Sequence, residues 1–182
     1  MSRSKNLISL GIIKNPNISH ESILYLTAAV PRLSFLDLRE CTNIDLNVAV
    51  KNMEHFTELK ELYIGPASVA RIKSDEFISS LMGHIPDLFV LHLSQLSGLV
   101  DDDLCEVLKH AVALHDFYVS FIDFGWKMAG ALSSCLPNLI KLSLVGSKTF
   151  VDADLRCICG SMTNLSVLIL AACPRISDAG FS

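Results

Sequence analysis

The chain has 182 residues, of which 51% are hydrophobic and 19% charged, and its formal net charge at pH 7 is −4. No apolar run approaches the roughly 18 residues that a membrane-spanning helix needs, so we expect the apolar side chains to form a core and the chain to have no membrane segment. Lys and Arg form no cluster that could neutralise phosphate groups, so the composition argues against a nucleic-acid partner.

The segment from Met1 to Ile13 has basic residues ahead of a short apolar stretch, as a secretory signal does. We reject a signal because no small-residue cleavage site follows the stretch and because the same residues fit the repeat described next. Without an export signal, the cysteines are expected to be reduced thiols in the cytoplasm or nucleus. They are Cys41, Cys105, Cys135, Cys157, Cys159 and Cys173.

One pattern, L-x-x-L-x-L, recurs along the chain, and its first leucines are 25 to 29 residues apart. A near-constant period of this length predicts a protein built of stacked repeats. The triplets are Leu7-Leu10-Ile12, Leu33-Leu36-Leu38, Leu59-Leu62-Ile64, Leu88-Leu91-Leu93, Leu114-Phe117-Val119, Leu139-Leu142-Leu144 and Leu165-Leu168-Leu170. They predict one domain, 1–182, with repeats at about 7–32, 33–58, 59–87, 88–113, 114–138, 139–164 and 165–182.

The second half of each repeat predicts a turn and a helix. At the same offset from the triplet, an apolar residue is followed by a Val-Asp step, as in Leu99-Val100-Asp101 of the fourth repeat and Phe150-Val151-Asp152 of the sixth. The Asp or Ser of this step is expected to cap the helix by accepting free backbone N–H groups. Apolar residues then recur at helical spacing: Leu104, Val107, Leu108, Ala111 and Leu155, Ile158, Cys159, Met162. Prolines mark where the helix has ended before the next strand: Pro31, Pro86 and Pro137.

A strand-turn-helix unit of this length cannot bury its apolar face alone. Stacking places the leucines in one continuous ladder and pairs the strands in a parallel sheet. Helices are wider than strands, so the stack is expected to curve, right-handed, with the sheet on the concave side and the helices on the convex side. The predicted fold class is an α/β solenoid of about seven repeats, the last incomplete.

From Leu165 to Phe181 the sequence reads L-x-x-L-x-L-x-x-C-x-x-I-S-D-x-G-F, and Leu33 to Ile44 matches the first half of that motif with Cys41 in place. This motif resembles the cysteine-containing leucine-rich repeat, and the resemblance covers nearly the whole chain. The family is best known from F-box/leucine-rich-repeat proteins, which implies a solenoid that captures a substrate for a cullin-RING ubiquitin ligase. Other residues hold the cysteine position elsewhere: Asn15, Ala67, Leu96, Ile122 and Ser147.

The sequence departs from this family in having no F-box ahead of its repeats. We therefore expect either a fragment or isoform of a longer protein, or a relative that works without its own F-box. In the first case a ubiquitin-ligase adaptor is an expected partner through the missing segment. The alternative is a structural scaffold in a ciliary or cytoskeletal complex, with no role in ubiquitin transfer.

The third and fifth positions of L-x-x-L-x-L are expected to project from the concave face. Because neighbouring strands are about 4.8 Å apart, Tyr63, His92 and Tyr118 should be neighbours there. Exposed aromatic rings rimmed by charges are typical of a protein-binding patch, although cross-strand packing alone also favours aromatic residues in sheets. The predicted protein-binding residues are Phe35, Asp37, Arg39, Glu61, Tyr63, Val90, His92, Asp116, Tyr118 and Lys141.

We expect no enzyme activity and no metal or cofactor. His92 could pair with Asp116 or Asp37, but no Ser or Cys nucleophile with an oxyanion site lies beside them. Cys157 and Cys159 fall roughly 200° apart on a helix, so they cannot bind one metal together.

Two further features of the sequence have structural interpretations. Asp101 is expected to be a helix cap, with Asp102 and Asp103 as first-turn acids that complement the helix dipole, rather than a metal site. Trp126, where the fifth helix should start, either fills a gap on the convex side or forms a contact there.

Overall fold

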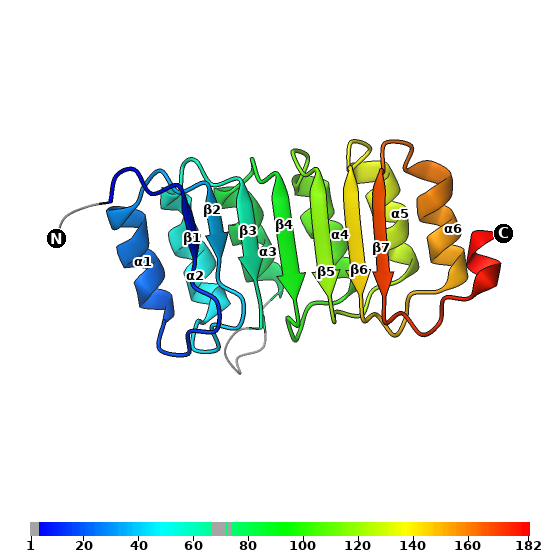
Figure 1. The fold of residues 1–182 in the computed structure, drawn as a ribbon, viewed down its shortest axis with the longest axis horizontal. Helices are drawn as coiled ribbons and strands as arrows, with labels where there is room; N and C mark the ends of the chain where they lie inside the picture. The colour runs from blue at the N-terminus through cyan, green and yellow to red at the C-terminus, as the bar shows by residue number, and fades with distance from the viewer. Residues whose placement is uncertain (1–3, 67–71, 73) are drawn as a thin grey trace.

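The computed structural model describes residues 4–66, 72 and 74–182. Seven strands form one parallel sheet in sequence order, each hydrogen-bonded to the next, as Figure 1 shows. The strands are β1 Ser9–Gly11, β2 Phe35–Asp37, β3 Glu61–Ile64, β4 Val90–Ser94, β5 Asp116–Ser120, β6 Lys141–Val145 and β7 Val167–Ala171. The recurring triplet therefore marks the strands, as predicted.

Helical segments follow the strands, and the α-helices lie on one side of the sheet while its other face is open (Figure 1). This open face is the one predicted to be concave, and we call it the concave face. They are α1 His20–Ala29, α2 Leu46–Asn52, η1 Met53–His55, α3 Ser74–His84, α4 Asp101–His110, α5 Trp126–Cys135, α6 Asp152–Ser161 and η2 Asp178–Phe181. Helices α1, α3 and α5 end before Pro31, Pro86 and Pro137, as expected from the restricted backbone around proline. The architecture is the predicted α/β solenoid.

The leucine ladder is the core of the stack. In the five inner repeats every triplet residue is buried, and the strands align them in register, for example Leu62 with Leu91 and Leu91 with Phe117. In the first and last repeats the triplets are only partly buried, because each has a neighbouring repeat on one side alone. Cys41 is buried in its turn with its Sγ against the carbonyl of Ile12, which agrees with its interpretation as a small core residue.

Each turn after a strand uses a left-handed backbone conformation. The positive φ falls four residues after the second triplet residue in most repeats, as at Glu40 and Phe121. In the third repeat that position is Pro66, whose ring fixes φ near −65°, so Gly65 takes the left-handed conformation instead, with φ of 113°. A Cβ on Gly65 would lie 1.7 Å from the carbonyl oxygen of Ser94, so only glycine fits there.

The prediction that Asp101 caps its own helix is wrong. The N-cap of α4 is Val100, in extended conformation, and Asp101 is the first helical residue. The backbone N–H of Val100 donates instead to the carboxylate of Asp103, at 2.8 Å, and α6 repeats this arrangement with Val151 and Asp154. Asp102 and Asp103 are first-turn acids, as expected.

Candidate functional site: an aromatic row on the concave face

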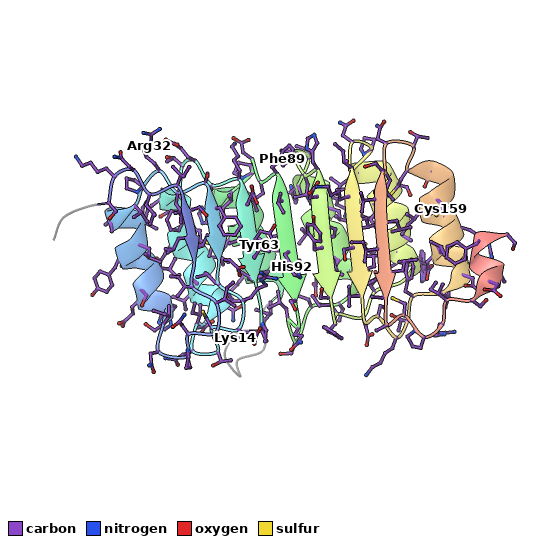
Figure 2. The ribbon with its side chains drawn as sticks, in the orientation of Figure 1. Lys14, Arg32, Tyr63, Phe89, His92 and Cys159 are labelled. Carbon is purple, nitrogen blue, oxygen red and sulfur yellow. The ribbon has the colours of Figure 1, made fainter. Side chains whose placement is uncertain are left out.

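The predicted aromatic neighbours form a continuous row on the concave face. Tyr63, His92 and Tyr118 are direct cross-strand partners on β3, β4 and β5. The ring centroids of Tyr63 and His92 are 5.6 Å apart, and those of His92 and Tyr118 are 5.7 Å apart. Phe35 extends the row, with its centroid 5.3 Å from that of Tyr63. We call Phe35, Tyr63, His92 and Tyr118 the aromatic row; Figure 2 labels its two central members.

At one end of the row, Asp37 and Arg39 form an ion pair. The guanidinium donates to both oxygens of the carboxylate, with Nη2 2.6 Å from Oδ2. Asp37 is only 2% exposed, so its charge depends on this partner. The bonded carboxylate raises the pKa of Arg39, and the guanidinium carbon lies 5.1 Å from the Tyr63 ring centroid, where a cation–π contact forms.

At the other end, Asp116 is paired with Lys141. The Lys141 Nζ lies 2.9 Å from Oδ2 of Asp116, and the Tyr118 hydroxyl donates to the same oxygen at 3.2 Å. Asp116 raises the pKa of Lys141, while burial is the main reason for the raised pKa of Tyr118. The two pairs hold charges at both ends of the aromatic row in fixed positions.

His92 is a neutral ring in the middle of the row. Burial lowers its pKa to about 4. Its Nε2 shares a hydrogen bond of 3.2 Å with the hydroxyl of Ser120 on β5. Neither Asp37 nor Asp116 is hydrogen-bonded to His92 among the described residues, since Arg39 and Lys141 hold those carboxylates. The arrangement does not give His92 the oriented acid that a catalytic pair requires.

Two predicted residues are placed differently from their neighbours. Val90 was expected to be exposed but is only 6% exposed, in register with Glu61 on β3 and Asp116 on β5, and Asp116 is itself only 8% exposed. Glu61 is partly exposed between Phe35 and Val90. In the part of the chain that the structure describes, its carboxylate has no hydrogen bond or ion pair.

The sequence analysis missed a stacked pair at the rim of this face. The rings of Phe89 and His115 are 4.1 Å apart and nearly parallel, with an interplanar angle of 14°. Both residues directly follow the first leucine of their triplet. A comparison of this second position of L-x-x-L-x-L between repeats, like that of the third and fifth positions, would have found them. Phe89 is 44% exposed beside the concave surface (Figure 2).

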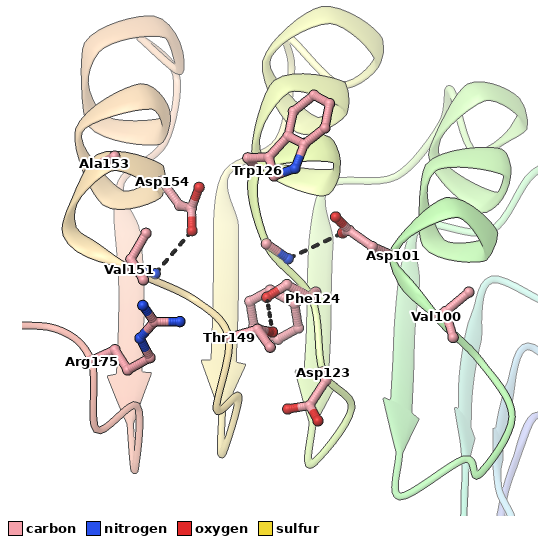
Figure 3. A pocket seen from close by; sticks show the side chains of 11 residues that line it. Val100, Asp101, Asp123, Phe124, Trp126, Thr149, Val151, Ala153, Asp154 and Arg175 are labelled. Atoms are coloured by element: carbon pink, nitrogen blue, oxygen red, sulfur yellow. Dashed lines mark hydrogen bonds between the residues drawn. The ribbon is translucent and has the colours of Figure 1, made fainter.

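Away from the aromatic row, a hollow of about 540 Å³ lies among the turns of the fourth to seventh repeats (Figure 3). It forms where the fifth repeat is one residue short: six positions separate Gln95 from Asp101, but only five separate Phe121 from Trp126. Trp126 therefore begins α5 at the position that aspartate holds in repeats four, six and seven. It is 74% exposed, so it does not fill a gap in the convex side. The alternative, that Trp126 forms a contact on the convex side, remains a prediction.

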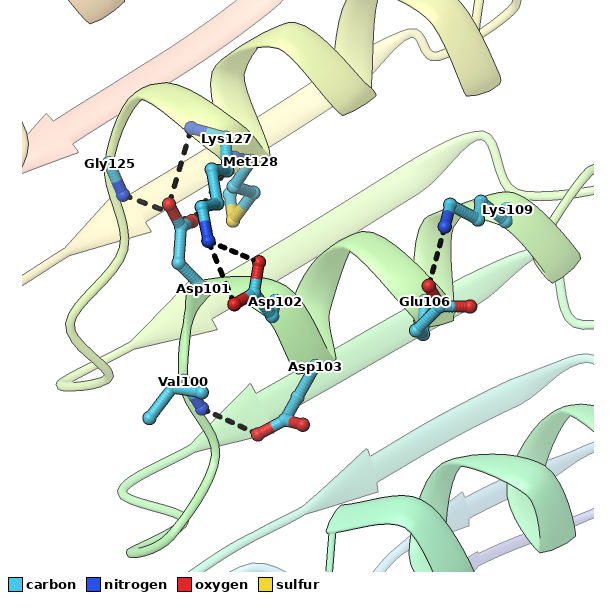
Figure 4. Close-up of polar contacts among 9 residues, drawn as sticks. All are labelled: Val100, Asp101, Asp102, Asp103, Glu106, Lys109, Gly125, Lys127 and Met128. Carbon is cyan, nitrogen blue, oxygen red and sulfur yellow. Dashed lines mark hydrogen bonds and ion pairs between the residues drawn. The ribbon is translucent and has the colours of Figure 1, made fainter.

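Aspartate at this position clamps the following repeat. The carboxylate of Asp101 accepts the backbone N–H groups of Gly125 and Met128 at 3.1 Å and that of Lys127 at 3.2 Å (Figure 4). Asp152 likewise accepts the backbone N–H of Ser177, at 2.8 Å. The Trp126 side chain has no acceptor oxygen, so it cannot clamp α6 in this way.

The described residues hold no group of three or more metal-ligating side chains, and all six cysteines are free, with Cys157 and Cys159 exposed on α6. No described helix combines the length and the apolar character needed to cross a bilayer. Ala67, one of the replaced cysteine positions, lies outside the described residues.

Comparison with known proteins establishes the fold alone. No protein-family model and no curated protein matches the sequence. A chain in the crystal structure of the yeast Rad7 and Elc1 complex is similar, with a TM-score of 0.67 and 19% identity over 97% of this chain and 53% of that one. An internalin, InlF, from Listeria monocytogenes str. 4b F2365 has a TM-score of 0.54 and 16% identity, covering 90% of this chain and 48% of that one.

The TLR13–ssRNA13 complex contains a third similar chain, with a TM-score of 0.52 and 13% identity over 96% of this chain and 30% of that one. The present chain spans about half the length, or less, of these three proteins. They are leucine-rich-repeat proteins, and the similarity extends over 90% or more of this chain. The chain has the leucine-rich-repeat solenoid fold.

Proposed function

We propose that this chain is a non-catalytic protein-interaction module that binds its partner on the concave face. The observation that carries the proposal is the aromatic row, in which four rings from adjacent strands lie on an open sheet between two fixed ion pairs. Protein interfaces are enriched in Tyr, Phe and Arg, and the rigid aromatic rings supply large contact areas at low entropic cost. A protein partner fits better than a nucleic acid, because the net charge is −4 and this face has no excess of cations.

We further propose that the module is the substrate-recognition part of an F-box/leucine-rich-repeat protein of a cullin-RING ubiquitin ligase, in the cytoplasm or nucleus. The support is the cysteine-containing motif from Leu165 to Phe181. The Rad7 and Elc1 structure adds that a protein complex contains a chain of this fold. As the alternative, a scaffold in a ciliary or cytoskeletal complex would use the same face for a permanent partner.

Affinity purification of the full-length protein from its own cells, with quantitative mass spectrometry, tests both the concave binding site and the role in a ubiquitin ligase. The Tyr63→Ala/Tyr118→Ala variant should lose its specific partners, because it removes two of the four rings of the aromatic row. Tyr25→Ala is the matched control, since Tyr25 is 72% exposed on α1, on the other side of the sheet. Equal partner recovery by both variants would contradict the site.

Recovery of a cullin and its adaptor with the full-length protein separates the two functions. The ligase proposal requires that both are recovered. The Tyr63→Ala/Tyr118→Ala variant should still recover them, because in that proposal the adaptor binds the F-box segment and not the concave face. Stable partners without any cullin or adaptor would favour the scaffold.

A further inference from the structure

We propose that the concave face binds a cationic side chain of its protein partner, foremost an arginine, at Glu61. The inference rests on the proposed function, because it names the partner chemistry of the same surface. Glu61 lies on β3, in register with Phe35 on β2 and Val90 on β4. Its carboxylate is therefore flanked by apolar side chains on both neighbouring strands, with the Tyr63 ring two residues further along its own strand.

Glu61 differs from the other acids of this surface because nothing in the described part of the chain neutralises it. Asp37 is held by Arg39 and Asp116 by Lys141. The cation next to it in sequence, Lys60, lies 3.3 Å from Asp87 on the rim. A partly buried carboxylate without a counter-ion is unfavourable beside apolar groups, so a partner that supplies a cation there gains both charge complementarity and specificity.

The charges on this surface set the sign of its electrostatic potential. Three carboxylates and two cations occur among the predicted binding residues, and the two cations are already paired. Burial and then the charge of Glu61 raise the pKa of Tyr63. Glu61 also contributes to the raised pKa of Tyr118, after burial and Asp116. Glu61 thus places a negative charge near both rings that no described residue neutralises, and this charge attracts a cation and repels an anion.

The neighbouring rings can also receive a cation. Arg39 already places its guanidinium 5.1 Å from the Tyr63 centroid, which shows that this surface stabilises that group. Phe35, beside Glu61, offers a second ring. A planar guanidinium can stack on a ring while it donates two parallel hydrogen bonds to one carboxylate, whereas a lysine ammonium acts as a point charge. This is why arginine is preferred over lysine.

Selection from a phage-displayed library of random peptides tests the inference on the whole chain. Wild-type protein, Glu61→Gln and Glu21→Gln are immobilised in parallel. Glu21→Gln is the matched control, because Glu21 is an exposed acid in the first turn of α1 and its loss changes the net charge equally. Wild type and Glu21→Gln should select peptides enriched in Arg and Lys over the starting library, and Glu61→Gln should not.

Affinities of the selected peptides then locate the contact. Binding to Glu61→Gln should be about tenfold weaker than to wild type, as expected for one lost charge-assisted hydrogen bond. Replacing the peptide cation by Ala should weaken binding to wild type equally and leave binding to Glu61→Gln unchanged, which is the signature of a direct pair in a double-mutant cycle. Unchanged circular dichroism spectra establish that the variants are folded.

The outcomes separate this inference from the proposed function. Selected peptides without basic residues, or with equal affinity for Glu61→Gln, would overturn the inference. If such peptides still lose binding to Tyr63→Ala/Tyr118→Ala, the concave site stands and only its cationic specificity fails. If peptides bind that double variant normally, or if no peptide is selected, both proposals fail.

Discussion

At the scale of single residues, the concave face combines two ion pairs with one carboxylate, Glu61, that has no partner among the described residues, and with one histidine ring that burial keeps neutral. Histidine is the residue type whose charge ordinarily changes near neutral pH, but burial holds His92 neutral. The repeat period predicted that His92 would lie between Tyr63 and Tyr118, because register in a parallel sheet follows directly from spacing. Its hydrogen bond to Ser120 and its burial depend on how tightly neighbouring side chains pack, which spacing does not reveal.

The neutral state of His92 predicts a pH dependence of stability. Its folded pKa of about 4 lies below the value of about 6.5 in the unfolded chain, so the unfolded state binds more protons between these values. Stability should therefore fall as the pH drops from about 6.5 to 4. We expect a loss on the order of 1 kcal/mol, since the ring is partly exposed and solvent screens its charge.

Thermal unfolding of wild type and His92→Phe at pH 7 and pH 4.5 measures this effect. The Phe variant keeps a ring in the row but cannot be protonated, so its Tm should fall less on acidification than that of wild type. The same fall in both proteins would show that His92 is not the group responsible.

At the scale of elements, the sequence indicated where α4, α5 and α6 begin but not what holds their first turns. The apolar residue, the Asp and the helical spacing after it were enough to place α4 and α6 within a residue. The role of Asp101 was misassigned because its bonding partners, Gly125, Lys127 and Met128, belong to the next repeat. Sequence rules for helix capping relate an aspartate only to the helix that contains it, so they could not predict these partners. The one-residue shortening of the fifth repeat, by contrast, was present in the spacing of the leucines.

The clamp predicts different costs for two adjacent aspartates. Asp101→Ala should lower the free energy of unfolding by about 1–2 kcal/mol, because three backbone N–H groups at the start of α5 lose their acceptor. Asp102→Ala is the matched control: it removes an exposed ion pair with Lys127, at 2.7 Å, and should cost less than about 1 kcal/mol. Urea unfolding followed by circular dichroism measures both. Equal losses would contradict the clamp.

At the scale of the whole molecule, the near-constant recurrence of one leucine triplet was enough to predict the fold, because such units bury their apolar faces by stacking. The sheet is open at both edges, β1 and β7. On β7, Val167 and Ile169 are exposed, and Leu168 and Leu170 are only partly buried. An exposed apolar edge strand is a template for pairing with another chain.

The open edge predicts that the 182-residue chain associates with itself as its concentration rises. Ile169→Lys should reduce this association, because a charge on an edge strand opposes edge-to-edge pairing. Tyr25→Lys, which changes the net charge equally on α1, should not. Size-exclusion chromatography with light scattering distinguishes them, and a wild-type chain that stays monomeric at high concentration would contradict the prediction.

The substitution of tryptophan for aspartate at position 126 has a mechanical consequence. Asp101 ties the fourth repeat to the fifth, and Asp152 ties the sixth to the seventh, but no such link from Trp126 joins the fifth to the sixth. The fifth and sixth repeats are joined instead through their turns, where Ser147 and Thr149 hydrogen-bond with the backbone of Phe124. We therefore expect the first turn of α6 to open more easily than that of α5, and amide hydrogen exchange would then show lower protection there.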